Sequence, residues 1–470
     1  MTVKTEISLD SFFIFNPNLG LKEGEEEKKI LYYYPKSTDL KTKVRNIGLS
    51  EAIFNFTRTF NPDQPCEVLN TLKIRQIYYN PEPNIYLVLV LKVPFCRTVD
   101  GDVEYQSDHI QTEIYLSVLK QMYRECILFT SPFSCLSHNQ LVMQLDTFYE
   151  KYLPTLRIQN CDIMDLFQGI HFLPLDKSTF LHIHSCINLM QAVFPFIKYS
   201  MFLCHEQLVW SGLDMEDTQL VFRYLVANIL YPLLDSETIQ SKEGSALPRI
   251  SSSTNNYGRF LTGATNLDSN LELETPPIVH LHHHTGLDEK YYFVIYNALS
   301  ITVCLFIPVE TTILSLDTYK RLDVFLSPKL TSLASEVSSY TSNSNISSLD
   351  NSSNGPKFIY FNQLNLAMKS SIHNNYRKSN NNISIDPNVM RILMDIKSAN
   401  KYEEFYIVIQ HKNANLIEIN GKSITEVIGK YSNSREFYIV IQHKNANLIE
   451  INDEVKKICD SQLENIFFCQ

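Results

Sequence analysis

Short motifs of bond-making enzymes are missing from this sequence. It contains no HExxH, no GxSxG and no Walker loop, which mark zinc peptidases, serine hydrolases and P-loop nucleotidases. The ten cysteines include no CxxC pair, so neither a zinc ribbon nor a disulfide framework is indicated, and we expect buried, reduced thiols. These absences favour a protein that acts through binding surfaces, with no metal, no cofactor and no small-molecule substrate.

Long apolar runs and excess positive charge are missing as well. The longest apolar stretches, residues 85–93 and 291–308, are too short or too polar to cross a bilayer, which takes about 20 apolar residues. Residues 1–10 lack a basic region followed by an apolar core, so we expect no secretory signal and a cytosolic location. The net charge of −10 opposes attraction to phosphate backbones, and we expect no nucleic acid as a partner.

The composition is that of a folded protein rich in sheets. Hydrophobic residues make up 44% and charged residues 20% of the 470, and 26 tyrosines and 27 phenylalanines accompany a single tryptophan. Aromatic residues favour strands over a purely helical array. At about 100 to 200 residues per domain, the length predicts roughly three domains.

The first sixty residues predict two strands followed by a helix. Residues 11–17 and 29–35 are dense in aromatic and β-branched side chains, and each segment ends at a proline, which cannot donate to a sheet. Residues 44–60 carry apolar side chains at helical spacing, and we expect this face to pack on the sheet: Leu49, Ala52, Ile53, Phe56 and Phe60. A first domain over residues 1–158 would be completed by strands 67–79 and 84–93 and helices 107–131 and 139–153.

Two further domains are predicted downstream. The second, residues 159–340, is interrupted by a long internal loop at about 232–277 and would contain helices 176–192, 214–229 and 315–340, a hairpin 199–210 and strands 291–296 and 300–308. Residues 341–355 are too polar to be ordered and form a linker. The third domain, residues 356–470, would contain strand 357–361, helix 387–399, a hairpin 437–451 and a closing helix 453–467. The fold class is therefore α+β, with three antiparallel sheets flanked by helices.

One segment of the third domain occurs twice. Residues 404–420 and 436–452 are the same seventeen residues, EFYIVIQHKNANLIEIN. Solenoid repeats diverge and recur at least three times, so the pair indicates a recent local duplication or an error in the gene model. Because only the second copy is followed by a helical pattern, we expect residues 437–451 to occupy the native sheet. The first copy would then be an added strand or a competitor for the same place.

Six segments of the sequence resemble one family. They are SFFIFNPNLGLKEGEEEKKILYYYP, KVRNIGLSEAIFNFTRTF, LVWSGL, YGRFLTG, KFIYFNQLNLAMKSS and HKNANLIEINDEVKKICDSQLENIFF. In this order they resemble the calcium-caffeine-zinc sensitivity protein family over nearly the whole chain. The similarity departs at the first copy of the repeat, where the family has a different acidic, strand-forming segment.

The resemblance implies a fold and a function. It implies three longin domains in a heterodimer with the monensin-sensitivity protein, and this pair serves as guanine-nucleotide exchange factor for the late-endosomal or vacuolar Rab GTPase. It implies a cytoplasmic protein recruited peripherally to late-endosome and lysosome membranes. In that family the first longin domains of both subunits jointly hold the GTPase. Two alternatives stay open: a longin-based trafficking adaptor without exchange activity, and a metal-dependent hydrolase built on histidine clusters.

Candidate contact residues follow from the expected packing of helix 44–60. If Leu49, Ile53, Phe56 and Phe60 face the sheet, the other faces present candidates for touching the GTPase or the partner subunit, which are Arg45, Asn46, Ser50, Asn55 and Arg58. The competing interpretation is that these are ordinary solvated residues.

A basic stretch and two histidine clusters are further candidates. Residues 351–385 contain no acidic side chain and four cations, so this surface could rest against anionic lipids through Lys357, Lys369, Arg377 and Lys378. The alternative is a flexible polar loop. The histidine clusters combine His182, His184 and Cys186 with Cys204 and His205, and His280 with residues 282–284. Zinc takes such ligands, but the first cluster lies in a predicted helix, whose periodicity separates the side chains, and we expect no metal.

Overall fold

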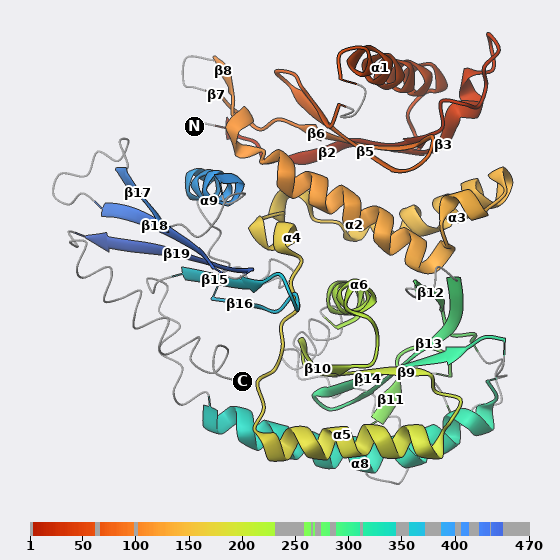
Figure 1. The fold of residues 1–470 in the computed structure, drawn as a ribbon. Coiled ribbons are helices and arrows are strands. Elements are labelled where there is room, and N and C mark those ends of the chain that lie inside the picture. The colour runs from red at the N-terminus through yellow and green to blue at the C-terminus, as the bar shows by residue number, and fades with distance from the viewer. Residues whose placement is uncertain are drawn as a thin grey trace. The chain divides into compact units, whose positions relative to one another are not determined.

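Figure 1 shows the computed structural model of the chain. The residues that it describes are 3–61, 66–97, 102–230, 258–264, 267, 274–282, 288–310, 314–344, 357–371, 387–399, 406–412, 423–432 and 434–444. The chain divides into two compact units, Met1–Phe167 with Asp386–Arg391, and Gln168–Ile385 with Ile392–Gln470.

A five-stranded antiparallel sheet forms the centre of the first unit. Its strand order is β3-β2-β6-β5-β4. The strands are β2 (Ser8–Phe15), β3 (Ile30–Tyr34), β4 (Val68–Asn70), β5 (Ile74–Glu82) and β6 (Ile85–Lys92). The central strand β6 is a continuous apolar run because both of its faces are buried.

Helices cover both faces of this sheet (Figure 1). On one face lies α1 (Leu40–Arg58), and on the other lie α2 (Thr112–Thr130) and α3 (His138–Tyr152). Successive side chains of β2 point to opposite faces of the sheet and so contribute to the hydrophobic core on each face. Phe12 and Ile14 point toward α2 and α3, whereas Phe13 and Phe15 point toward α1. A small sheet of β1 (Val3–Lys4), β7 (Phe95–Arg97) and β8 (Val103–Tyr105), and the short helix α4 (Ile163–Phe167), complete the unit.

The second unit contains two sheets, of which the first follows the order β10-β9-β14-β13-β11, with β12 also paired to β13. The strands are β9 (Tyr199–Cys204), β10 (Gln207–Ser211), β11 (Gly258–Phe260), β12 (Ile278–His282), β13 (Asp288–Ala298) and β14 (Ile301–Pro308). Helices α5 (Lys177–Val193) and α8 (Leu316–Ser344) run side by side along one face, and α6 (Met215–Leu225) covers the other (Figure 1).

Glycine allows one close approach in this sheet. A Cβ atom at Gly258 on β11 would overlap the hydroxyl oxygen of Tyr296 on β13. That hydroxyl donates to Oδ1 of Asp323 on α8 over 2.6 Å, so the ring cannot swing away without breaking a half-buried hydrogen bond. The bond ties α8 to the sheet.

The other sheet of the second unit follows the order β16-β15-β19-β18-β17. Its strands are β15 (Lys357–Asn362), β16 (Met368–Ser370), β17 (Tyr406–Lys412), β18 (Ser423–Ser432) and β19 (Arg435–Lys444), and its helix is α9 (Pro387–Ala399). Lys397 on α9 donates from Nζ to both carboxylate oxygens of the buried Glu436 on β19, at 2.9 and 3.2 Å. This ion pair ties the helix to the central strand.

The two copies of the duplicated segment lie on either side of β18. The second copy supplies β19, which pairs with both β15 and β18, so residues 437–444 lie in the sheet as predicted, and the rest of the predicted range 437–451 lies outside the described residues. The first copy supplies β17, an added strand at the edge that pairs with β18 only among the described strands. The two registers differ by one residue, because Lys430 pairs with Tyr406 on one side and with Phe437 on the other, whereas Tyr438 is the counterpart of Tyr406.

The predicted elements differ from the structure in several places, among them the strand predicted over 67–79, which is the two strands β4 and β5, and the strand β18, which was not predicted. Within the predicted loop 232–277 the structure has the strand β11, which pairs with β13. A strand of only three residues in a polar segment has too short a pattern to be predicted. Helix α8 continues to Ser344, into the predicted linker 341–355, whose remainder lies outside the described residues. The described partners of β19 are β15 and β18, whereas the second strand of the predicted hairpin, residues 447–451, lies outside the described residues together with the predicted helix 453–467. The predicted domain boundaries stay predictions.

A buried carboxylate in the first unit gives a testable prediction about stability. Glu82 accepts hydrogen bonds from the Tyr123 hydroxyl and from the backbone amides of Phe133 and Ser134, at 2.6 to 2.7 Å. Replacing Glu82 by Ala leaves three donors without their acceptor and should lower the free energy of unfolding of this unit by about 3 kcal/mol.

Urea unfolding followed by hydrogen-exchange mass spectrometry on peptides from α2 measures this loss. Glu104→Ala, at an exposed position of β8, is the matched control and should leave the urea midpoint unchanged. Equal midpoints for the two variants would contradict the role given to Glu82.

Candidate interaction surface on the first helix

The helix α1 packs on its sheet through one narrow face. Its residues Ile47, Ser50 and Phe54 recur at intervals of three and four and are buried. The ring of Phe54 lies 4.9 Å from that of Tyr78 and 4.4 Å from that of Tyr86, measured between centroids. These ring contacts fix which side of the helix meets the sheet.

Polar contacts hold the helix in the same rotation. The Asn46 amide donates to the Tyr33 hydroxyl over 2.8 Å, and the Arg58 guanidinium donates to the Tyr86 hydroxyl over 2.7 Å. At the start of the helix the carboxylate of Asp39 accepts from the amide of Thr42, and this hydrogen bond is the main reason why the pKa of Asp39 lies below its ordinary value. The bonds of Asn46 and Arg58 therefore fix the rotation of α1 on the sheet, while the Asp39 bond caps its first turn.

The predicted buried face of this helix is wrong. Leu49, Phe56 and Phe60 were expected to pack on the sheet, but their side chains are 49%, 65% and 75% exposed. The reason is that the sequence of α1 contains two apolar stripes, one through Ile47 and Phe54 and one through Leu49 and Phe56. The sheet accepts the stripe that meets its tyrosine rings and leaves the other outside.

The exposed stripe forms what is called here the outer ridge of α1, defined as Arg45, Gly48, Leu49, Ala52, Asn55 and Phe56, with Phe60 just beyond the helix. The rings of Phe56 and Phe60 stack edge to face, 4.9 Å apart, so they present one apolar surface. Position 48 is open, since a Cβ atom there would meet nothing within 4 Å. Packing among the described residues therefore gives no reason for a glycine that weakens the helix by about 1 kcal/mol relative to alanine.

The five predicted contact residues fall into two groups. Arg45 and Asn55 are exposed on the outer ridge, as expected. Asn46 and Ser50 were wrongly placed on other faces, because Asn46 is bonded to Tyr33 and Ser50 is fully buried, with its hydroxyl donating to the carbonyl of Asn46. Arg58 is exposed but bonded to Tyr86. Contacts of any of them with a partner stay a prediction.

Sequence reasoning missed Gly48, Leu49, Phe56 and Phe60 as surface residues. Two signals could have found them. A glycine in the middle of a helix, with a charged residue one turn before it and large apolar residues after it, is unusual unless another backbone approaches it. The second apolar stripe, at the same helical period but rotated from the first, was visible in the same window.

The predicted membrane contacts are partly described. Lys357 lies on β15 opposite Val440, and Lys369 lies on β16 opposite Tyr360. Lys369 is half-buried, and burial lowers the pKa of its ammonium group because it penalises the charged form. Arg377 and Lys378 lie outside the described residues. A contact between these four cations and anionic lipids stays a prediction.

The histidine clusters do not assemble into a site in the part of the chain that the structure describes. His182 and His184 lie on the helix α5, and His182 pairs through Nδ1 with Glu336 on α8 over 2.9 Å. His280 lies on β12 and is buried. The described residues contain no group of three or more potential metal ligands. No helix among them is both long enough and apolar enough to span a bilayer.

Comparison with family models matches three consecutive parts of the chain. Residues 9–130 match the first longin domain of INTU, CCZ1 and HPS4, residues 197–333 match Intu longin-like domain 2, and residues 352–458 match Intu longin-like domain 3. The first match includes the whole of α1 and its sheet.

Comparison with whole proteins gives the same family. The chain is 39% identical over 473 residues to the vacuolar fusion protein CCZ1 homolog of Xenopus laevis, covering 98% of this chain and 97% of the relative. It is 38% identical over 451 residues to the homolog of Nematostella vectensis, covering 89% and 95%, and 26% identical over 442 residues to that of Dictyostelium discoideum, covering 88% and 95%. The chain therefore belongs to the vacuolar fusion protein CCZ1 family and is built from three longin-like domains, with antiparallel sheets flanked by helices.

Proposed function

We propose that this chain is one subunit of a heterodimeric guanine-nucleotide exchange factor that activates the late-endosomal or vacuolar Rab GTPase. Its partner subunit is the monensin-sensitivity protein, and the pair acts in vesicle-mediated transport to the lysosome while bound peripherally to the membrane. Membership of a family whose relatives are named for vacuolar fusion supports a role in trafficking. The three longin-like domains support a role as a binding platform.

The outer ridge of α1 is the observation that carries the proposal. Burying a large apolar side chain stabilises an interface by about 1.5 to 3 kcal/mol, so a protein that leaves Leu49, Phe56 and Phe60 in solvent leaves that free energy for another molecule. Beside the ridge, β3 is the terminal strand of its sheet and α1 contacts it. An edge strand has backbone groups with no partner strand on its outer side. Helix ridge and strand edge together suit a protein partner.

Exchange needs no bond-making group from this chain. An exchange factor binds the nucleotide-free GTPase more tightly than the loaded form, and linkage requires that the same difference loosens the nucleotide. A coupling of about 4 kcal/mol would speed release roughly a thousandfold if it lowered the barrier to dissociation equally. A rigid platform of sheet and helix supplies such differential binding.

We assign different parts of the ridge to the two partners. The apolar part, Leu49, Phe56 and Phe60 around the open position of Gly48, takes the partner subunit, because apolar contact areas and small residues suit a permanent interface. The polar side chains of Arg45 and Asn55 flank this part and take the GTPase. The alternative function, a trafficking adaptor without exchange activity, would use the same apolar contact but would not need the polar one.

The exchange activity is tested by release of a fluorescent guanine nucleotide from the purified Rab GTPase. The wild-type heterodimer should accelerate release, and Arg45→Glu should slow the accelerated rate by about tenfold, since a lost charge-assisted hydrogen bond costs about 1.5 kcal/mol. Lys41→Glu, one turn earlier on the same helix, is the matched charge control and should reduce the rate less. Release that stays at the intrinsic rate with the wild-type heterodimer would favour the adaptor.

Removing the exposed rings should weaken the heterodimer without unfolding the chain. The double substitution Phe56→Ser with Phe60→Ser deletes about 3 kcal/mol of interface burial and should raise the dissociation constant for the partner subunit roughly a hundredfold. Isothermal titration calorimetry measures this change. Leu72→Ser, at another exposed apolar position of the same unit, is the control and should bind normally. Unchanged affinity of the double variant would remove these rings from the interface.

Two substitutions at Gly48 test the stability of the helix and the binding of the partner subunit separately. Gly48→Ala should raise the free energy of unfolding of the isolated chain by about 0.5 to 1 kcal/mol, because the helix gains propensity and the new methyl group meets no atom. Gly48→Leu should keep this stability but weaken binding of the partner subunit, because the bulky side chain prevents close approach. Thermal unfolding and a binding titration check the two effects. If the Gly48→Leu variant and the wild-type chain bound the partner subunit equally well, no backbone would approach the helix here.

A further inference from the structure

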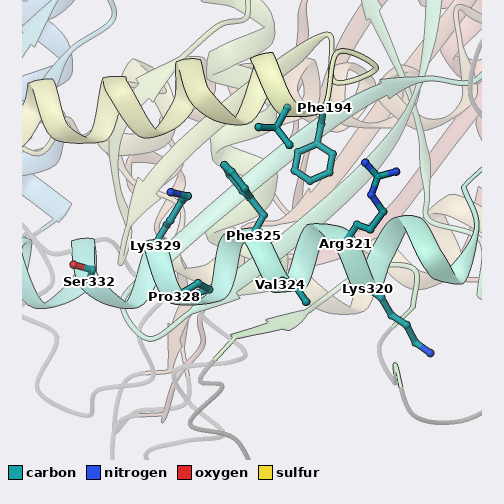
Figure 2. A pocket seen from close by; sticks show the side chains of 9 residues that line it. Phe194, Lys320, Arg321, Val324, Phe325, Pro328, Lys329 and Ser332 are labelled. Carbon is teal, nitrogen blue, oxygen red and sulfur yellow. The ribbon is translucent and has the colours of Figure 1, made fainter.

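An open groove lies on the helix pair of the second unit, in a different part of the chain from the surface proposed for exchange. It runs between the end of α5 and the middle of α8 and has a volume of about 730 Å³ (Figure 2). This is within the usual range for a binding cleft. Its base is Phe194, whose buried ring meets that of Phe325 edge to face at 5.4 Å between centroids.

The walls of the groove include apolar side chains that do not belong to the hydrophobic core. Helix α8 turns another face to the core, with Leu322, Leu326 and Leu330 almost fully buried. Val324 and Val193, which line the groove, are 74% and 43% exposed. Both helices therefore expose apolar side chains to solvent beside the packed rings of Phe194 and Phe325.

A proline adds a polar feature to the same wall. Pro328 lies inside α8 and has no N–H group, so it cannot donate the helical hydrogen bond to the carbonyl of Val324. Both residues line the groove. The helix thus lacks one of its hydrogen bonds at the wall of the groove.

The charges at the groove all have one sign. The lining contains Lys320, Arg321 and Lys329 and no acidic residue. Arg321 lies over the ring of Phe194 at 5.9 Å and Lys329 over that of Phe325 at 5.0 Å, so two cations rest on the aromatic rings of the groove itself. Among the described residues no carboxylate forms an ion pair with any of the three.

The apolar surface continues along α5 beyond the groove. Leu181 and Leu189 are exposed, and with Val193 they follow the four-residue spacing of one helix ridge, in which Ser185 is the polar member. From residue 181 to residue 193 this ridge is about 18 Å long, or roughly three helical turns. The length matches a helical segment laid alongside and exceeds what a compact small molecule needs.

We propose that this groove docks an amphipathic helix of a partner protein, with apolar residues on the inner face and Asp or Glu residues at the edges. Apolar side chains at spacings of three and four enter the groove, and the carboxylates pair with Lys320, Arg321 and Lys329. An anionic membrane is the weaker alternative. Three basic residues contribute about 1 kcal/mol each at a lipid surface, which is too little for stable binding by a chain of net charge −10.

The test uses the full chain in complex with its partner subunit and a fluorescein-labelled peptide of about 18 residues, with leucine on one helical face and glutamate at its edges. Fluorescence anisotropy should show saturable binding that weakens as salt rises. Val324→Asp should weaken binding by about tenfold or more, and so should the double reversal Arg321→Glu with Lys329→Glu. Lys177→Glu, at the exposed start of α5, is the matched control and should change the affinity by less than about twofold.

Three further outcomes would contradict the proposal. A peptide with every glutamate replaced by lysine should not bind, and equal binding of both peptides would overturn the charge argument. Binding that is unaffected by the groove substitutions would place the peptide elsewhere. The protein could instead bind vesicles that contain phosphatidylserine, with binding that depends on Lys320, Arg321 and Lys329, while the acidic peptide fails to bind. This result would identify a lipid site.

Two measurements separate folding and exchange from docking. Circular dichroism should show an unchanged melting temperature for Val324→Ser, a milder variant at this exposed position, which should still weaken peptide binding. Nucleotide release from the Rab GTPase in solution should be unaffected by Val324→Asp, because the groove lies outside the first domain. A variant that loses peptide binding but keeps exchange activity therefore has a defect in the groove alone. If the wild-type complex showed no exchange activity, the peptide-binding result would still test the groove.

Discussion

The contact between Phe54 and the rings of Tyr78 and Tyr86 determines what the first domain offers to other molecules. Centroid distances of 4.4 and 4.9 Å leave little freedom for the helix to roll about its axis. The hydrogen bonds of Asn46 and Arg58 to Tyr33 and Tyr86 act in the same sense. Aromatic side chains inside the domain therefore decide which residues of α1 are outside it, and the function proposed for the ridge depends on that choice.

The strands and helices of this chain could largely be predicted from their local patterns. The run of residues 85–93 became β6, and the helix expected over 387–399 became α9, because a continuous apolar run or a proline after an acid depends on short-range physics. The short β11 and the extension of α8 could not be predicted in this way. A three-residue strand is stabilised by its neighbour β13 and has almost no pattern of its own.

The candidate site was harder to predict for a different reason. Periodicity identifies apolar stripes on a helix but gives no information on which of two stripes the sheet will cover. For α1 the answer depended on the tyrosines of β3, β5 and β6, which are distant in sequence. Arg45 and Asn55 were placed outside correctly. Asn46 and Ser50 were assigned to other faces, although the Asn46 side chain donates to Tyr33 and the Ser50 hydroxyl donates to the backbone carbonyl of Asn46.

The duplicated segment gives the third domain two copies of one strand under unequal constraint. The copy in β19 is hydrogen-bonded on both sides, and its Glu436, Tyr438 and Ile439 are buried. The copy in β17 pairs on one side with β18. A substitution in the central copy disturbs strand pairing on two sides, whereas the same substitution in the edge copy disturbs pairing on one side among the described strands. Identical sequences in this sheet therefore carry unequal tolerance to change, with the edge copy the more tolerant of the two.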